Sequence, residues 1–471
     1  MAADRKEDIQ TVRIPFIGNP TNRSTNADKD QRFVNCYFDV VENPITGKQV
    51  YYLVKRPGTS QLSQPSGGAA TARGGISWRG DIYTVYGTKI YKNSSDLGVT
   101  LTTSTGICGF AATRPGAGTQ YLGINDGAKL YLISTAGAVT TVSTIPNPNT
   151  RDLIYMDTYF FTLETDGTIS NCDSDDPTTW PGEEIVMQMY NGSGVVLAHQ
   201  NNLLYGFATT SLQAFYDAAN SSGSPLTNAE QNAFQAGAAS HDSLVFDEGL
   251  VTWVGNSDTG GFTVWTLDGN SGLKEIGTSE IRRVLDGEGT SISSCRAMLM
   301  RTCGKKLYLL TLMSANRTFV YDYETSLWNE WQAAGATTRW PMIDCFQHNS
   351  ALIAQHESDG WLYTVSPTVY QDNSVNFTVL ARFGRVDFDT DDRKFVNGYE
   401  LIGDIQSTTT NVDFQYSDDD YQTLSTARIF DMSLVRPFLK RGGNFRRRAH
   451  QISYAGANPL RAESLEMKIR L

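Results

Sequence analysis

The chain has 471 residues, of which 40% are hydrophobic and 11% aromatic, and a formal net charge of −11 from 39 Lys and Arg against 50 Asp and Glu. A protein that grips nucleic acid needs a surplus of basic groups, so this balance argues against tight wrapping of DNA, although an acidic surface that DNA slides past stays open. The apolar share excludes a disordered chain, and the 42 Gly together with the aromatics favour a β-rich protein with many turns.

The N-terminal region carries charges of both signs and no apolar segment, so it is neither a secretory signal nor a membrane anchor. No stretch of the chain approaches the roughly 18 uninterrupted apolar residues of a membrane-spanning helix. We therefore expect a soluble protein made in a cytoplasm, which stays there or leaves inside a larger assembly. A polar arm, NPTNRSTNADKDQRF, and two short strands, VNCYFDV and QVYYLVKRPGT, make up the rest of residues 1–60.

Residues 80–92, GDIYTVYGTKIYK, predict a β-hairpin with a turn at Gly87 between two strands of β-branched and aromatic residues. A lone hairpin is only marginally stable in water, so this one needs neighbours. Similar signals recur, each with an aliphatic-Tyr pair shortly after a glycine: GAKLYLIS from residue 127, GKKLYLLT from residue 304 and GWLYTVS from residue 360. Looser versions at 156–170, 201–216 and 249–267 bring the number of units to seven.

These seven units follow one another at intervals of 38 to 57 residues. Such a period is the size of one four-stranded propeller blade. The spacing predicts an all-β fold, a β-propeller of about six or seven blades over residues 61–367, in which each blade buries its faces against the next. A β-sandwich, or several small β-domains that share turn chemistry, is the alternative.

One short helix is expected in the segment TSEIRRVLDG, residues 278–287. Thr278 or Ser279 can cap its first turn and Gly287 can end it. Its apolar stripe, which is more typical of packing than of a binding face, consists of Ile281, Val284 and Leu285.

After residue 367 the period is lost, and alternating strands predict a separate C-terminal β-rich docking module over residues 368–471. A basic cluster in this module, RPFLKRGGNFRRRAH, stands out in an acidic chain. We expect its cations to flank a turn at Gly442 and Gly443, with Phe438 and Phe445 interleaved. The candidate residues for a subunit or DNA contact are Arg436, Lys440, Arg441, Arg446, Arg447 and Arg448.

These basic residues could clasp phosphates or an acidic protein patch. Alternatively, their guanidinium groups could pair with carboxylates of the same chain or of a neighbouring subunit. Because the whole chain is acidic, a subunit contact is favoured over DNA.

The sequence lacks the motifs of common reaction centres: the phosphate-binding loop with its Lys, the GxSxG elbow, the HExxH helix and the GxGxxG strand exit. Its six Cys include no Cys-x-x-Cys pair, so buried core positions are favoured over a disulfide framework. Cys345 and His348 lie three residues apart without further ligands nearby, which is a weak metal signal. We therefore expect no catalytic residue, no metal site and no cofactor.

Carboxylates need separate attention because some β-propellers hydrolyse glycosides with a carboxylate pair. The run YSDDDYQTL at 416–424 partly resembles the Asp-box hairpin of such enzymes, with Ser417, Asp419 and Thr423 in place. That box ties down backbone amides in a turn, so we expect a structural hairpin. A carboxylate pair formed by residues distant along the chain stays open.

Several stretches, taken in order, resemble one known family. Near the start, an Asn-x-Tyr precedes an apolar strand that ends in Pro-Gly; then come DDPTTW, a Ser, Trp-x-Gly and Gly-rich turn pattern, the capped helix, and a Tyr-Asp, Thr, Trp hairpin. The positions that carry these patterns are Asn35, Tyr37, Pro57, Gly58, Ser243, Trp253, Gly255, Gly260, Tyr321, Asp322, Thr325 and Trp328. On these residues the chain is identified as a distant member of the packaged-DNA stabilisation proteins, the tail hub or nozzle subunits of short-tailed bacteriophages (podoviruses).

The resemblance implies a structural virion protein without enzymatic activity, assembled in the host cytoplasm into a homo-oligomeric ring of typically six copies. The ring would lie in the tail below the portal and adaptor proteins, extend the DNA channel, help to retain packaged DNA, and carry fibre, spike or needle proteins. DNA would pass through without tight binding, and no small-molecule substrate is implied. Two other interpretations stay open: a carbohydrate-active propeller that degrades glycans at the tail, and a monomeric scaffold that binds proteins on its propeller face.

Overall fold

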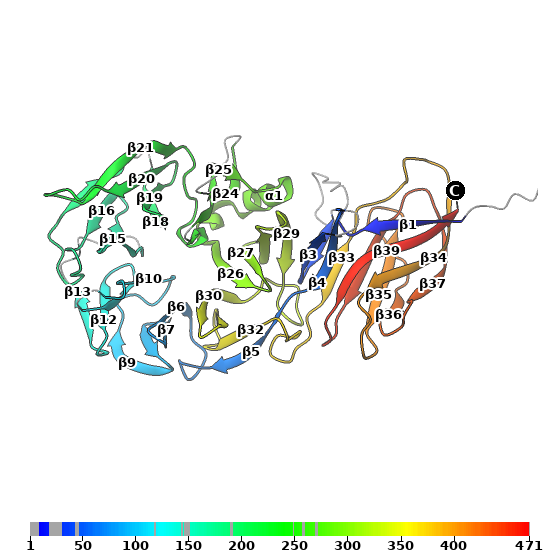
Figure 1. Ribbon diagram of the computed structural model, residues 1–471, viewed down its shortest axis with the longest axis horizontal. Helices are drawn as coiled ribbons and strands as arrows, with labels where there is room; N and C mark the ends of the chain where they lie inside the picture. Colours follow the sequence, from blue (N-terminus) through cyan, green and yellow to red (C-terminus); the bar gives the residue numbers. More distant parts are fainter. Residues whose placement is uncertain are drawn as a thin grey trace, which may run out of the picture. The chain divides into compact units, whose positions relative to one another are not determined.

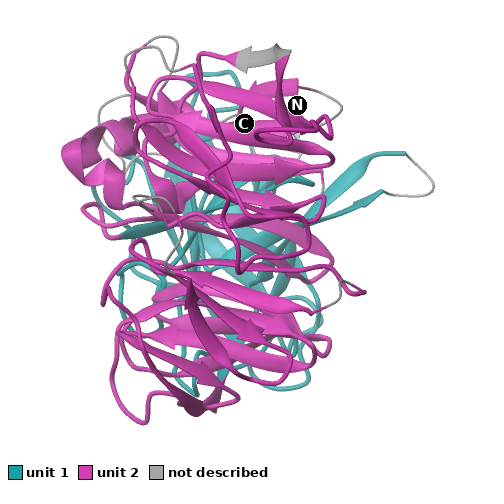
Figure 2. Ribbon diagram, turned by 90° about the vertical axis from the view of Figure 1, so that its left-hand side faces the viewer, with its two compact units in different colours: residues 1–60, 317–340, 366–471 teal, residues 61–316, 341–365 magenta. Residues whose placement is uncertain are grey.

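The computed structural model describes residues 9–17, 31–42, 47–116, 119–142, 145, 151–188, 192–247, 249–256, 260–268 and 272–470 (Figure 1). The start of the chain and most of the predicted polar arm lie outside these residues. The chain divides into two compact units, which Figure 2 colours separately. Unit 1 comprises residues 1–60, 317–340 and 366–471, and unit 2 comprises residues 61–316 and 341–365.

Unit 2 is a β-propeller of small antiparallel sheets, which are built from strands that follow one another along the chain, except that β5 joins the last sheet (Figure 1). The first three sheets are β6 (Ala72–Trp78), β7 (Asp81–Tyr86), β8 (Lys89–Lys92), β9 (Ser95–Thr100); β10 (Gly109–Ala112), β11 (Tyr121–Asn125), β12 (Leu130–Ser134), β13 (Val139–Val142); and β14 (Ile154–Met156), β15 (Tyr159–Leu163), β16 (Thr168–Asn171), β17 (Glu184–Val186).

The next two sheets are β18 (Gly194–Gln200), β19 (Leu203–Ala208), β20 (Leu212–Asp217), β21 (Leu226–Phe234); and β22 (Val245–Asp247), β23 (Leu250–Asn256), β24 (Phe262–Asp268), β25 (Gly272–Glu275). A further pair is β26 (Arg296–Thr302) with β27 (Lys305–Leu312). The last sheet contains β30 (Met342–His348), β31 (Ala351–His356) and β32 (Leu362–Ser366), with β5 (Gly58–Ser63) as its fourth strand. The predicted all-β propeller is therefore confirmed.

The hairpin predicted at residues 80–92 forms as β7 and β8, with Gly87 at φ 54° in the turn. Its support comes from the next blade, since Tyr83 and Val85 share one buried cluster with Leu122 and Ile124 of β11. The same arrangement joins later blades, where Phe207 of β19 and Trp253 of β23 stack edge to face. Each blade thus buries its hydrophobic face against a neighbour, which a single hairpin cannot do.

The predicted helix is also present, as α1 (Ser279–Glu288). The side chain of Thr278 accepts a hydrogen bond from the Ile281 amide and caps the helix, as expected. The predicted end at Gly287 is wrong, because the helix continues for one more residue and Gly289, at φ 55°, closes it. Two 3₁₀ turns, η2 (His241–Ser243) and η3 (Gly289–Ser294), complete the helical structure that the described residues contain in this unit.

Unit 1 consists of two β-layers around one core. The first layer contains β1 (Gln10–Pro15), β3 (Cys36–Glu42), β4 (Gln49–Lys55), β39 (Arg461–Arg470), β34 (Lys394–Gly403) and β37 (Phe438–Phe445). The second contains β28 (Arg317–Asp322), β29 (Leu327–Trp331), β2 (Arg32–Val34), β33 (Val379–Arg382), β38 (Ala449–Tyr454), β35 (Asn411–Ser417) and β36 (Arg428–Asp431).

The core of unit 1 joins strands from both ends of the chain. Phe38 of β3, Tyr399 of β34 and Phe414 of β35 belong to the same buried cluster. The strand β1 pairs antiparallel with β39 over six residue pairs, so the first described strand and the last one lie side by side. From the sequence we expected the strands of residues 1–60 and those after residue 367 to belong to separate regions, whereas the structure combines them around one core.

Candidate functional site

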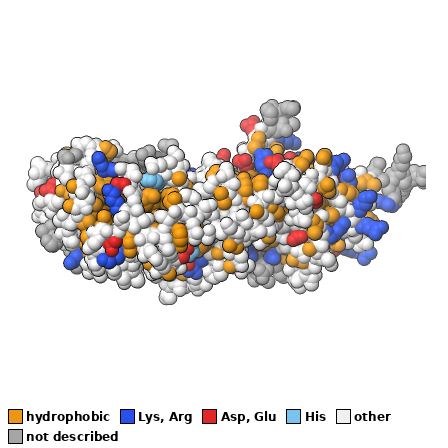
Figure 3. Space-filling view, turned by 90° about the horizontal axis from the view of Figure 1, so that it is seen from below, with side chains coloured by type: hydrophobic (Ala, Val, Ile, Leu, Met, Phe, Trp, Pro, Cys, Tyr) orange, Lys and Arg blue, Asp and Glu red, His pale blue; other side chains and the backbone are white. Residues whose placement is uncertain are grey.

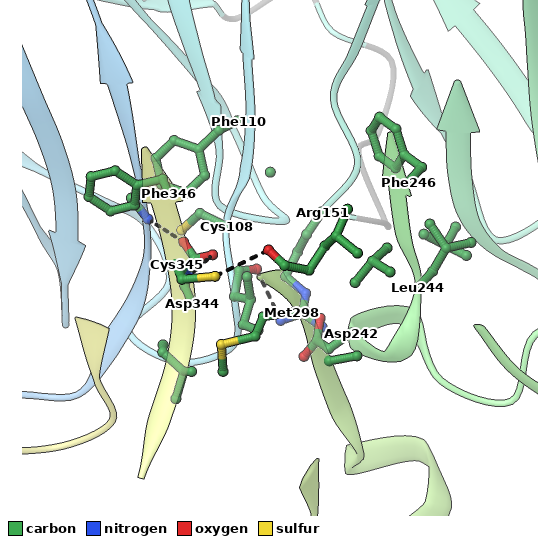
Figure 4. A pocket seen from close by; sticks show the side chains of 18 of the residues that line it. Cys108, Phe110, Arg151, Asp242, Leu244, Phe246, Met298, Asp344, Cys345 and Phe346 are labelled. Atoms are coloured by element: carbon green, nitrogen blue, oxygen red, sulfur yellow. Dashed lines mark hydrogen bonds and ion pairs between the residues drawn. The ribbon is translucent and has the colours of Figure 1, made fainter. Parts of the chain in front are cut away.

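A cavity that is open to solvent lies at the centre of the propeller. It has a volume of about 480 Å³ and takes lining residues from the first strand of seven successive blades: β6, β10, β14, β18, β22, β26 and β30. Figure 4 shows its side chains, among which Phe110 and Phe346 supply apolar surface and Arg151, Asp242 and Asp344 supply charge. Seven innermost strands correspond to seven blades, at the upper end of the range that the spacing predicts.

A network of ion pairs occupies one wall of this cavity. The Arg151 guanidinium lies 3.0 Å from an Asp242 carboxylate oxygen, and the same carboxylate is 2.8 Å from His241 Nδ1. On its other side, His241 Nε2 is 3.1 Å from an Asp152 oxygen. Burial alone would lower the pKa of His241, but the two carboxylates outweigh burial and raise it to about 9. The imidazole is therefore protonated at neutral pH, so it does not act as a general base.

Two further polar side chains of the cavity, those of Asp344 and Cys345, also make hydrogen bonds within the protein. Asp344 accepts hydrogen bonds of 2.8 Å from the Gly75 and Cys345 amides, while burial raises its pKa to about 6. Burial also raises the pKa of the Cys345 thiol well above its ordinary value, and the thiol donates to the Leu299 carbonyl. A thiol in that state is a poor nucleophile and a poor metal ligand.

The metal signal at Cys345 and His348 resolves into separate contacts, because His348 Nδ1 lies 2.9 Å from Ser77 Oγ. No group of three His, Cys, Asp or Glu residues in the described ranges is placed to hold a metal ion. Cys36, Cys108, Cys172 and Cys295 are buried free thiols, which confirms core positions for four of the six Cys. No helix among the described residues has the length and hydrophobicity needed to cross a membrane.

The basic cluster lies in unit 1, where the structure separates its members. Arg448 is buried and makes a bidentate pair with Asp418 at 2.6 and 2.8 Å, and it also donates to backbone carbonyls. Arg436 makes a bidentate pair with Glu400 at 2.7 Å. These two guanidinium groups stabilise unit 1 itself, as the alternative of pairing within the chain expected.

The other four basic residues are exposed, and Arg447 reaches only to 3.7 Å from Asp420. Lys440, Arg441 and Arg446 have no carboxylate partner within the part of the chain that the structure describes. Lys440 and Arg441 border a shallow groove with Phe395, Val396 and Phe438. The cations that the sequence grouped together are therefore of two kinds, two that make bidentate pairs with carboxylates of unit 1 and four that make no such pair among the described residues.

The predicted turn at Gly442 and Gly443 is wrong. Both residues lie inside β37, where the pairing with β34 shifts register between Val396 and Gly398 and forms a bulge. Gly443 has φ 74°, which suits glycine, and a Cβ on Gly442 would lie 2.4 Å from Val396 Cγ1. A bulge and a turn both require permissive backbone, so a Gly-Gly pair does not distinguish them in sequence.

The Asp-box remnant is a structural turn, as predicted. Asp419 accepts from the Ser417 hydroxyl at 2.7 Å, and from the Thr423 amide and hydroxyl at 2.9 and 2.6 Å. These hydrogen bonds lower the pKa of Asp419 to about 2, and the one from the Thr423 hydroxyl has the largest effect. The carboxylate is occupied by its own turn.

Sequence reasoning missed the cavity network of Arg151, Asp152, His241 and Asp242. The two pairs are separated by about 90 residues, and neither has a recognisable spacing. The only signal was indirect. These charged residues come next to the first strand of a blade, and in a propeller that strand lies nearest to the central axis.

The fold places the chain in the class of β-propeller proteins. Residues 13–370 match the protein family described as Bacteriophage P22 Gp10, beta-propeller, and the chain belongs to this family of phage stabilisation proteins. It is thus a structural phage protein, and the predicted resemblance is confirmed. No curated protein matches the chain.

Solved structures show weaker similarity. A streptogramin B lyase structure has 11% identity and a TM-score of 0.41, and the alignment covers 67% of this chain and 97% of that chain. The WD40 repeats of RRP9 have 10% identity and a TM-score of 0.40, with 66% and 99% of the two chains covered. A chain of the mitotic checkpoint complex has 11% identity and a TM-score of 0.40, with 74% and 98% covered. Similarity at this level says nothing about the activity of this chain.

Proposed function

We propose that the chain is a tail hub or nozzle subunit of a short-tailed bacteriophage. Several copies, six by the expectation from the family resemblance, form a ring below the portal and adaptor. The ring extends the DNA channel, helps to retain packaged DNA, and docks fibre, spike or needle proteins. Assembly takes place in the host cytoplasm, and the protein resides in the virion tail.

The observation that carries this proposal is the match to the phage stabilisation family over residues 13–370. The size of the central cavity bears on where DNA would pass. One base-pair step of a DNA duplex, roughly 20 Å across and 3.4 Å high, occupies about 1,000 Å³. The cavity of about 480 Å³ at the propeller centre is smaller than this, which supports a channel that lies between copies of the chain.

The distribution of charge supports a conduit that does not hold DNA. Unit 2 contains 14 Lys and Arg against 26 Asp and Glu, a net charge of −12, whereas unit 1 has 25 against 24, a net charge of +1. An acidic propeller wall repels phosphates, which lets DNA slide past. Retention of the genome then needs a mechanical seal because affinity does not supply it.

The proposal is tested by the assembly state of the full-length chain, alone and mixed with the portal and adaptor. We expect a closed ring, with six copies of 51.9 kDa giving about 311 kDa, seen by mass photometry and in cryo-EM class averages. A chain that stays monomeric in both settings would contradict the proposal. Incubation with surface polysaccharides tests the glycan-degrading alternative at the same time, and we expect no release of reducing ends.

A further inference from the structure

The sheet edge at β37 carries two exposed cations, Lys440 and Arg441, whose backbone carbonyls accept hydrogen bonds from the Arg428 side chain. The strand β37 ends the sheet order β3-β4-β39-β34-β37, so its outer edge has no strand partner in that sheet. Lys440 and Arg441 lie on this strand, exposed, beside the groove that contains Phe395. In Figure 3 the Lys and Arg side chains gather at the right-hand end of the view, where Figure 1 draws β34 and β37. The basic groove is defined here as the groove with Lys440, Arg441 and Phe395.

Exposed apolar side chains accompany these cations. Phe395, which lines the groove with Val396 and Phe438, is 48% exposed, and Leu434 and Val435, which precede β37 in the chain, are 54% and 80% exposed. Phosphate binding needs donors and positive charge but gains nothing from bare aliphatic groups. A surface that combines apolar contact area with unpaired charges is typical of protein interfaces. We therefore consider a protein of opposite charge as the partner.

A surface with the matching chemistry exists on this same chain, in the third blade of the propeller. Residues 153–188 contain eight Asp and Glu and no Lys or Arg. The outermost strand of this blade, β17, ends its sheet and carries an exposed Glu184 and a Val186 that is 57% exposed. Burial, and then the neighbouring charges of Asp166 and Glu184, raise the pKa of Glu164, so these carboxylates crowd one another.

We propose that the basic groove of one copy binds the β17 blade of a second copy. The contact joins two different surfaces, so it is heterologous, and successive copies can close a ring. Lys440 and Arg441, which have no carboxylate partner among the described residues, meet a blade that contains no Lys or Arg of its own, while Phe395 and Val186 supply apolar area. One carboxylate of this blade, Asp175, already pairs with Arg114. This inference rests on the proposed ring and names the surfaces that join its subunits.

Charge reversal on each side gives a test that does not depend on a single variant. Variant A is Lys440→Glu/Arg441→Glu, and variant B is Glu164→Lys/Glu184→Lys, both in the full-length chain. At the four exchanged positions A carries only carboxylates and B carries only cations, so like charges meet there in A alone and in B alone. In an equimolar mixture the exchanged positions of an A surface face exchanged positions of opposite charge on a B surface. The matched control for A, Lys129→Glu/Lys274→Glu, reverses two exposed lysines of other blades.

Mass photometry and sedimentation velocity then measure assembly. We expect A and B alone to raise the concentration for half-assembly by about 100-fold or more, the control to behave as wild type, and the A and B mixture to form rings again. Circular dichroism checks that each variant is folded. If wild type assembles and folded A assembles equally well, the surface assignment is overturned while the proposed ring stands. A wild-type chain that never assembles overturns both.

Adding duplex DNA to the same assay tests whether the basic groove binds nucleic acid instead of a second copy of the chain. If wild type retains DNA at physiological salt, A loses it, and assembly of A is unchanged, the basic groove is a nucleic-acid surface and the proposal is wrong. No retention by wild type, together with restored assembly in the mixture, supports the contact between copies.

Discussion

The two units of the chain are built in different ways. In unit 2, strands that follow one another along the chain pair with each other, as in β6 to β9. In unit 1, partners come from distant segments: β1 pairs with β39, and Val34 of β2 pairs with Glu330 of β29. Local pairing leaves a period in the sequence, whereas non-local pairing does not. Unit 1 also has to close longer loops before its contacts form, which slows folding.

The units differ in electrostatics as well, because each contains one histidine whose surroundings determine its charge, and the two charges differ. In unit 2, His241 lies between two carboxylates and is charged. In unit 1, His450 is fully buried against Phe414 and Tyr399, and burial lowers its pKa to about 3, so it is neutral. We expect the stability of the two units to respond to pH in opposite directions.

The largest effect is expected for Arg56→Ala in unit 1. The Arg56 side chain is fully buried, makes a bidentate pair with Asp372 at 3.0 and 2.6 Å, and lies 3.7 Å from the centre of the Phe377 ring. Removing it leaves the Asp372 carboxylate without its cation, which costs about 3–5 kcal/mol of unfolding free energy. Urea unfolding followed by Trp fluorescence measures the loss, because Trp331 and Trp340 flank the guanidinium.

The matched control is Arg13→Ala, since Arg13 is 56% exposed and pairs with Glu463 and Glu466 on the surface of the same unit. We expect it to cost about 1 kcal/mol or less. Equal losses for the two variants would show that the buried pair is worth no more than an exposed one. A loss spread over all of the unfolding signal, with no separate unit 1 transition, would show that the units unfold together.

The second prediction concerns acid and His450. Its folded pKa lies below the ordinary value, so it contributes stability that is present above about pH 6.5 and is lost as the pH falls toward 3. Between pH 7 and pH 4 we expect wild type to lose about 3 kcal/mol more than His450→Leu. Neither ring nitrogen has a hydrogen-bond partner among the described residues, so the apolar variant removes a buried polar group. If the unfolding free energies of the two proteins fall in parallel between pH 7 and pH 4, His450 does not contribute to the acid sensitivity.

How far the sequence predicted the fold follows from these differences. The Gly, aliphatic and Tyr signals at residues 127, 304 and 360 correspond to β12, β27 and β32, because turn glycines and alternating strands are local features. The hairpin of Tyr321 and Trp328 shows the limit. It has an aliphatic-Tyr pair and alternating strands but no glycine, and it belongs to unit 1. Its strand β29 pairs with β2, almost 300 residues away along the chain.

For the basic cluster, the sequence predicted which residues take part but not which partners they have. The sequence identified the cations of the basic cluster, but only tertiary structure separates Arg448, which binds Asp418, from Lys440, which binds no carboxylate in the described chain. Partners of buried charges come from other strands, so no spacing along the chain reveals them. The acidic blade was visible in the sequence as a run without Lys or Arg, a signal that the total charge of −11 concealed.

The smallest effect, and the one that completes the comparison, is expected for His241 at alkaline pH. Its folded pKa of about 9 lies above the ordinary 6.5, so its contribution is complete below about pH 6.5 and is lost as the pH rises through 9. Between pH 6.5 and pH 8.5 we expect wild type to lose about 2 kcal/mol more than His241→Gln. Burial lowers the pKa of Lys55 to about 8, so Lys55 titrates in this range as well. Its contribution is the same in wild type and variant and cancels in their difference. A flat difference would mean that the imidazole is neutral between Asp152 and Asp242, and the cavity wall would then carry net negative charge. A loss confined to the acid side would assign both histidines the same state and remove the contrast between the units.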